Sequence, residues 1–120
     1  MNEGRILINK LQMHEVKIKP LSVNQAWQGR RFKTPAYKVY ATAVTLLLPR
    51  NIIVPEGLLR VYYEFGVSNQ AADIDNGVKM LQDIIAKKYG FNDNRIYEAT
   101  IRKVITPKNG EYIKFSIEAF

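Results

Sequence analysis

The sequence of 120 residues predicts an α+β fold, a single domain in which two main helices pack on a largely antiparallel or mixed sheet. Two observations carry this prediction. Segments that alternate apolar and polar residues, as strands do, flank two segments with helical periodicity. The length and the 47% apolar content suit one hydrophobic core, so we expect one domain over residues 1–120, with 1–14 as a candidate N-terminal extension.

The first half of the chain contains two strand-like segments and a helix. Residues 5–9 have strand-like composition, and residues 15–19 alternate charged and apolar side chains as in a half-buried strand. Thr34 and Pro35 suit the N-cap and first position of a helix that we expect to end near Leu48. The apolar face expected for this helix consists of Val39, Ala43, Leu46 and Leu47.

The second half begins with a strand and a helix. Residues 58–67 are rich in β-branched and aromatic side chains, which favour a strand. Residues 78–85 have a helical period, with Asp75 or Asn76 as the expected cap and Gly90 as the left-handed residue beyond the helix end. The expected buried stripe consists of Val78, Leu81, Ile84 and Ile85.

The last two strand-like segments, residues 96–106 and 111–120, surround the dipeptide Asn109-Gly110. Asn-Gly between alternating segments is a strong signal for a tight turn. The sequence therefore predicts a β-hairpin here.

Composition excludes several classes of protein. The chain has no cysteine and one histidine, so any metal must be held by oxygen atoms. It has no Gly-rich phosphate loop, which argues against a nucleotide cofactor. It shows neither a signal-peptide pattern nor an apolar run long enough to span a bilayer, so we expect a cytoplasmic protein without a membrane partner.

The formal charge of +7 is unevenly distributed. Residues 1–50 hold nine Lys and Arg against two acidic residues, whereas residues 51–120 hold nine of each. A basic half beside a neutral, acid-containing half is typical of a nucleic-acid-binding surface next to an acidic site, although a merely basic, soluble surface gives the same count.

An acidic corner lies between the strand and helix of the second half. Asp73 and Asp75 are two positions apart, so in an extended segment their carboxylates lie on one side, and Lys79 follows one helical turn later. Asp93 follows the helix, in a turn that we expect to return towards the pair. Three carboxylates suit a hard cation such as Mg²⁺. The alternative for Lys79 is a plain surface pair with Asp83.

These residues resemble the RusA-type Holliday junction endonucleases. The resemblance rests on Asp-x-Asp-Asn-x-x-Lys at 73–79, Gly-Phe-Asn-Asp-x-Arg-Ile at 90–96 and a Pro-Leu-Ser-x-Asn turn at 20–24, and it covers roughly residues 15–120. It implies that Asp73, Asp75 and Asp93 hold Mg²⁺, with Mn²⁺ as a substitute, and that Lys79 is catalytic. Where relatives carry a basic residue before the first aspartate, this chain has Ala71 and Ala72.

A loop at residues 21–34 concentrates side chains suited to DNA. Basic groups neutralise phosphates and aromatic rings stack on bases. The structural alternative is that the aromatic residues cap the core and the basic ones are simply solvated. The candidate DNA-binding residues are Asn24, Trp27, Arg30, Arg31, Lys33 and Lys38, and we expect Tyr37 and Lys38 at the surface of the following helix.

The predicted function is Mg²⁺-dependent resolution of four-way DNA junctions by a symmetric homodimer. A junction is nearly two-fold symmetric and needs two cuts, whereas one chain carries one set of candidate catalytic residues. Candidate dimer surfaces are Arg5 to Asn9 and the strand Ile113 to Phe120. Two alternatives stay open: a flap or single-strand nuclease, and a non-catalytic module that binds branched DNA.

Overall fold

The computed structural model describes residues 13–21, 27–28, 32–73, 75 and 77–120. The segment Arg5 to Asn9, predicted as a strand and dimer element, lies outside these ranges. In chain order the elements are β1 (His14–Val16), β2 (Trp27–Gln28), β3 (Phe32–Lys33), α3 (Pro35–Leu47), β4 (Leu59–Val67), α4 (Val78–Tyr89), the 3₁₀ helix η1 (Asp93–Arg95), β5 (Ile96–Ile105) and β6 (Tyr112–Ala119).

Four strands form one mixed sheet in the order β1-β6-β4-β5, and β2 and β3 form a separate two-stranded ladder. The central strand β4 runs antiparallel to β6 and parallel to β5. The parallel pair requires a crossover, and α4 supplies it. The prediction of an α+β domain with a mixed sheet and two main helices is confirmed.

The predicted hairpin between β5 and β6 is wrong, because β4 lies between these two strands. The turn itself forms: Gly110 N–H donates to Pro107 O at 2.9 Å, and Asn109 adopts the left-handed conformation with φ +70°. Turn residues report a chain reversal, but they do not determine which strand becomes the partner. Strand β6 pairs with β4 along its length but with β1 only at Ile113, Lys114 and Phe115, and its role as a dimer surface stays a prediction.

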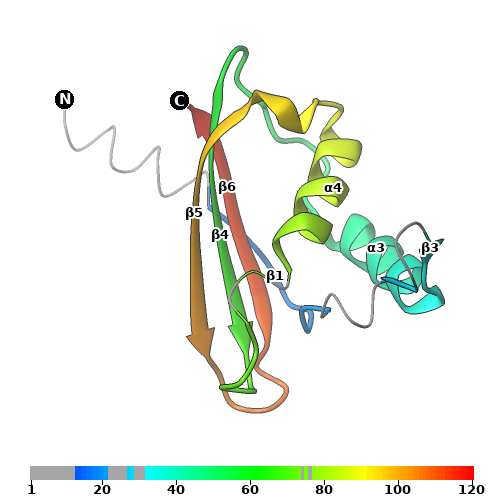
Figure 1. Cartoon of the computed structure of the whole chain (residues 1–120). Helices are drawn as coiled ribbons and strands as arrows, with labels where there is room; N and C mark the ends of the chain where they lie inside the picture. The colour runs from blue at the N-terminus through cyan, green and yellow to red at the C-terminus, as the bar shows by residue number, and fades with distance from the viewer. Residues whose placement is uncertain (1–12, 22–26, 29–31, 74, 76) are drawn as a thin grey trace.

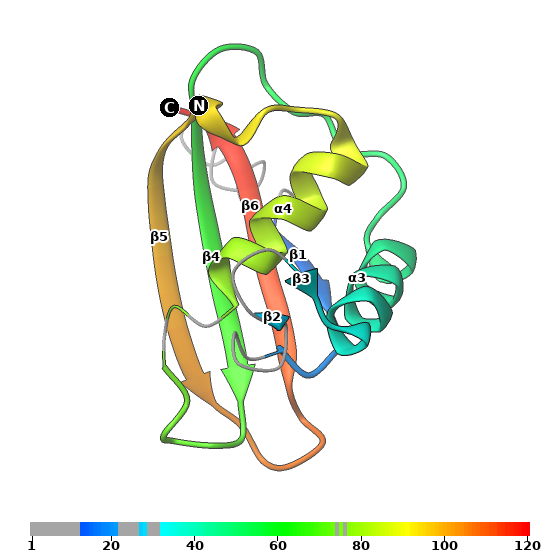
Figure 2. The same ribbon diagram turned by 45° about the vertical axis from the view of Figure 1, so that its right-hand side comes forward.

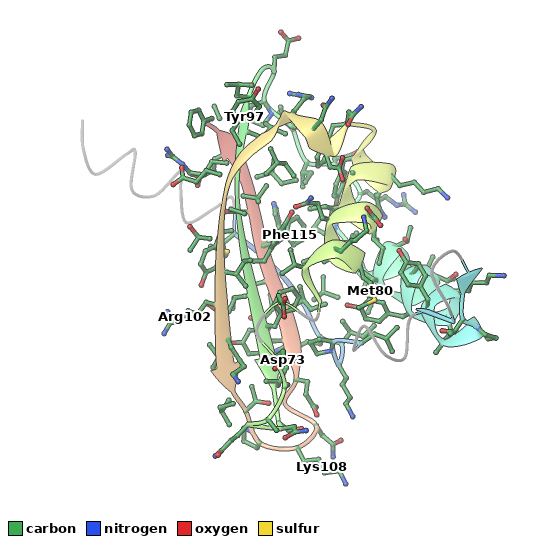
Figure 3. All side chains as sticks on the ribbon, in the orientation of Figure 1. Asp73, Met80, Tyr97, Arg102, Lys108 and Phe115 are labelled. Atoms are coloured by element: carbon green, nitrogen blue, oxygen red, sulfur yellow. The ribbon has the colours of Figure 1, made fainter. Side chains whose placement is uncertain are left out.

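Both helices cover the same face of the sheet (Figures 1 and 2). Alternate side chains of β4 and β6 point to that face, where the apolar stripe of α4 meets them. Phe115 lies on this side, whereas Arg102 points away from the helices (Figure 3). The buried side chains in these three elements are Leu59, Val61, Tyr63 and Phe65 of β4, Met80, Leu81, Ile84 and Ile85 of α4, and Ile113, Phe115 and Ile117 of β6.

Helix α3 begins as predicted, with the Thr34 hydroxyl oxygen accepting a hydrogen bond from Tyr37 N–H at 3.2 Å. Its buried face is different from the predicted one. Tyr37, Tyr40 and Val44 are buried, and so Tyr37 is not the surface residue that we expected. Two faces were available at helical spacing, and the one with two tyrosines buries more area. The predicted face is largely exposed: Val39 by 70%, Leu46 by 79% and Leu47 by 53%.

The face of the sheet opposite the helices carries a polar network around Glu64. The Glu64 carboxylate accepts hydrogen bonds from the hydroxyls of Tyr62 and Tyr112, each at 2.5 Å, and Lys114 lies 4.0 Å away. Gly66 makes room for this arrangement, since a Cβ atom there would lie 2.4 Å from the Tyr112 ring. Glu64 is only 7% exposed although no helix covers it. In the described part of the chain no helix has the length and apolar character needed to cross a membrane.

Candidate active site

The turn that follows β4 positions the first two candidate acids. Asn69 closes the turn, because its side-chain oxygen accepts from Ala71 N–H at 2.9 Å and its backbone oxygen accepts from Ala72 N–H at 3.1 Å. Asp73 and Asp75 come directly after it, and both are exposed. Neither forms an ion pair or a hydrogen bond through its carboxylate with any residue that the structure describes. The two carboxylates are therefore available for another partner.

Helix α4 begins without a side-chain cap. Gly77 is its N-cap residue, and Asp75 contributes only a backbone oxygen, which accepts from Val78 N–H at 3.2 Å. The prediction that the Asp75 side chain caps the helix is wrong, and Asn76 lies outside the described residues. Gly77 occupies the corner because it packs closely on Phe65: a Cβ atom would lie 2.7 Å from the Phe65 ring.

Lys79 lies on the solvent side of the first turn of α4, with its side chain 74% exposed. Its ammonium nitrogen is 3.9 Å from Asp83 Oδ2, one helical turn along. An exposed pair of this kind contributes only about 0.3–0.5 kcal/mol to stability. Lys79 is thus weakly held and lies within one turn of Asp75.

Asp93 lies at the other end of α4. The 12 residues of this helix separate the turn of Asp73 from η1, a length of about 18 Å. Figure 3 shows Asp73 towards the end at which β4 and β5 finish and Tyr97, which follows η1, at the opposite end. Burial raises the pKa of the Tyr63 hydroxyl, and the Asp93 charge raises it further.

The described residues contain no group of three or more histidine or acidic side chains arranged to hold a metal ion. From the sequence we expected the turn after α4 to bring Asp93 back to the pair. The structure does not place Asp93 there. Asp73 and Asp75 offer the hard oxygen atoms that Mg²⁺ prefers, and Mg²⁺ is often held by one or two carboxylates, waters and a substrate phosphate. Within one described chain the fit is therefore limited to the pair.

One charged residue beside the pair was not foreseen. Lys103 of β5 donates from its ammonium group to Gln70 O at 3.0 Å and to Ala72 O at 2.8 Å. The alternating pattern of residues 96–106 predicts only which face of the sheet Lys103 occupies, and not what lies over that face. The parallel pairing of β4 and β5, which the sequence did not reveal, puts that face under the turn of Asp73.

The candidate DNA-binding residues are only partly described. Asn24, Arg30 and Arg31 lie outside the described ranges, and for Trp27 and Lys33 the structure gives the backbone, in which they pair across the β2–β3 ladder. Lys38 is exposed on α3 and lines an open groove of about 600 Å³ between α3 and α4. Lys87 and Asp83 of α4 line the same groove, so Lys38 and Lys87 bring positive charge to it from two helices.

No protein-family model matches the chain, and no curated protein sequence matches it significantly.

Proposed function

We propose that this protein is a Mg²⁺-dependent, structure-specific endodeoxyribonuclease that resolves four-way DNA junctions. Asp73, Asp75 and Asp93 would be its metal ligands, and Lys79 would contact the phosphate that is cut. Arg30, Arg31, Lys33 and Lys38, with Asn24 and Trp27, would contact the DNA backbone and bases.

The availability of the carboxylates of Asp73 and Asp75 carries this proposal. Exposed acids at the start of a helix usually cap it or form ion pairs, and these two do neither with the described residues. They follow the carboxyl end of the central strand, a position that commonly carries binding and catalytic residues. Lys79 and Lys103 supply positive charge nearby, which a phosphate needs in order to approach two carboxylates.

A bound Mg²⁺ ion would supply Lewis-acid chemistry and a reactive water. The residues of this chain would hold it through the carboxylate oxygens of Asp73 and Asp75. Asp93 lies at the opposite end of α4, so its participation in this site would require a second copy of the protein. The homodimer is therefore part of the proposal, and the separation of these acids along α4 supports it.

Two observations favour a non-catalytic module that binds branched DNA. The three acids do not gather in one chain, and Lys79 has a surface partner in Asp83. In that case the basic residues of the first half would account for all of the function. A flap or single-strand nuclease would use the same chemistry as a junction resolvase on a different DNA shape.

A cleavage assay separates these functions. A synthetic four-way junction, a flap and a matched linear duplex are each incubated with the protein, with and without Mg²⁺. Symmetric cuts near the branch of the four-way junction, only with Mg²⁺, would support the proposal. Cutting only of the flap would favour the related nuclease. Tight junction binding without cuts in Mg²⁺ or Mn²⁺ would replace the nuclease with the binding module.

A further inference from the structure

Lys103 occupies an unusual place for a lysine. In the parallel register it lies beside Phe65, so it shares the face of the sheet that the helices cover, and it is half-buried there. Phe65 in turn packs against Gly77 at the start of α4. A lysine at this position lies directly under the turn that leads from Asn69 to Asp73.

The hydrogen bonds of Lys103 are directed at that turn. A lysine ammonium group has three N–H donors, and two of them serve the carbonyl oxygens of Gln70 and Ala72. The third has no acceptor among the residues that the structure describes. Ala72 directly precedes Asp73. The hydrogen bond from Lys103 to Ala72 O and the remaining N–H donor of Lys103 therefore lie one residue from the first candidate acid.

We infer that Lys103 is a positioning residue of the proposed site: it fastens the turn that carries Asp73, and its remaining N–H contacts a phosphate of the bound DNA. This inference rests on the proposed function. Ala71 and Ala72 bring no charge to the turn, and the two exposed aspartates repel a phosphate. The Lys103 ammonium places a compensating positive charge there, from a strand that pairs alongside β4.

The chain offers a matched control in Lys88. This lysine is also half-buried, and its ammonium group also donates to two carbonyl oxygens, those of Thr45 at 2.5 Å and Leu48 at 3.4 Å. Those carbonyls belong to the end of α3, far along the chain from Asp73. Lys88→Met therefore removes an ammonium group with two carbonyl acceptors at a different place in the fold. Lys88→Met and Lys103→Met are each compared with the unmodified protein by circular dichroism and thermal unfolding.

The test compares Lys103→Met, Lys103→Arg and Lys88→Met in three measurements. For Lys103→Met we expect faster hydrogen exchange at the amides of Ala71 and Ala72. We expect the log–log salt dependence of junction binding to lose about 0.9 in slope, one phosphate contact. We expect kcat for junction cleavage to fall about 10- to 100-fold, an effect typical of residues that orient catalytic groups. Lys103→Arg should recover most of each effect. Lys88→Met, whose side chain lines the groove of Lys38, should leave the hydrogen exchange at Ala71 and Ala72 unchanged.

The inference would be overturned by unchanged exchange and an unchanged salt slope in Lys103→Met, or by equal effects in Lys88→Met. The proposed function fails separately, if the unmodified protein cuts no DNA with Mg²⁺. Exchange and salt dependence do not require cleavage, so they still decide whether Lys103 holds the turn and contacts DNA.

Discussion

The carboxylates of Asp73 and Asp75 differ from most of the other acidic side chains in having no partner among the described residues. Glu15 and Glu98 are held by basic neighbours, and Glu64 by two tyrosines and a lysine. Free carboxylates on a chain of net charge +7 contribute little to folding. Their removal should therefore affect function much more than stability.

Replacing Asp73 or Asp75 with Asn is expected to abolish junction cleavage and to leave binding intact or tighter. The change replaces a carboxylate of the proposed metal site with a neutral amide and also reduces the repulsion of phosphate. Cleavage gels and binding titrations measure both effects, and the unfolding temperature should stay near that of the parent. Cleavage at the parent rate by both variants would show that these acids are not catalytic.

The Glu64 network predicts a specific pH dependence of stability. Burial raises the pKa of Glu64, but the hydroxyls of Tyr112 and Tyr62 and the nearby basic groups outweigh burial, so its pKa lies below the ordinary 4.5. The folded state thus binds the proton less tightly than the unfolded state. Glu64 stabilises the fold above about pH 4.5, and this contribution is lost as the pH falls through the lower folded pKa.

Glu64→Gln is expected to lower the free energy of unfolding at pH 7 by about 1–3 kcal/mol, because hydrogen bonds to a charged acceptor are replaced by weaker ones. Urea unfolding at several pH values measures the difference, which should shrink below pH 4.5. Glu98→Gln on the same face of the sheet, in an exposed pair with Arg60, is the control and should have little effect. A difference for Glu64→Gln that does not depend on pH would contradict this account.

At the scale of elements, the corner between β4 and α4 depends on close packing. Gly77→Ala places a methyl group 2.7 Å from the buried Phe65 ring, which must shift, at an expected cost of about 1–3 kcal/mol. Because the corner carries Asp75 and Lys79, we also expect a loss of junction cleavage, measured beside thermal unfolding. Gly90→Ala destabilises the other end of α4 through its left-handed φ of +70° and should leave the corner intact. Equal loss of cleavage in both variants would attribute the effect to stability alone.

The sequence predicted the existence and type of most elements, since these depend on local periodicity and on caps such as Thr34 and Gly90. The sequence did not predict which of two possible helix faces is buried or which strands pair with each other. Helix α3 had two faces at helical spacing, and packing selected the one with Tyr37 and Tyr40. The turn at Asn109-Gly110 was correct, but the partner of β6 is set by the whole sheet. Lys103 was missed for the same reason, because its role depends on pairing across more than 30 positions.

For the whole molecule, the separation of Asp93 from the acidic pair makes a prediction about assembly. Sedimentation equilibrium at micromolar concentration is expected to give about twice the chain mass of 13.8 kDa. A mass of one chain, with and without junction DNA, would contradict the dimer. It would also leave the proposed nuclease without a third acid.

A mixing experiment tests whether two chains share one site. Asp73→Asn and Asp93→Asn are each expected to be inactive alone. If a site combines the pair of one chain with the Asp93 of another, a mixed dimer keeps one intact site, and an equal mixture should recover about a quarter of the parent nicking rate. Two Asp73→Asn preparations mixed together are the control. No recovery, with subunit exchange verified by tagged chains, would show that Asp93 does not complete the site of a second chain.

The parallel pairing of β4 and β5 has a consequence for biosynthesis. Lys103 follows Ala72 by 31 positions, so the turn that carries Asp73 leaves the ribosome well before the lysine that fastens it. At ordinary elongation rates the interval is roughly 2 to 6 s. During that time the nascent chain has the acidic pair but no strand to hold it. The order of synthesis therefore delays completion of the site until β5 has been made and has paired beside β4.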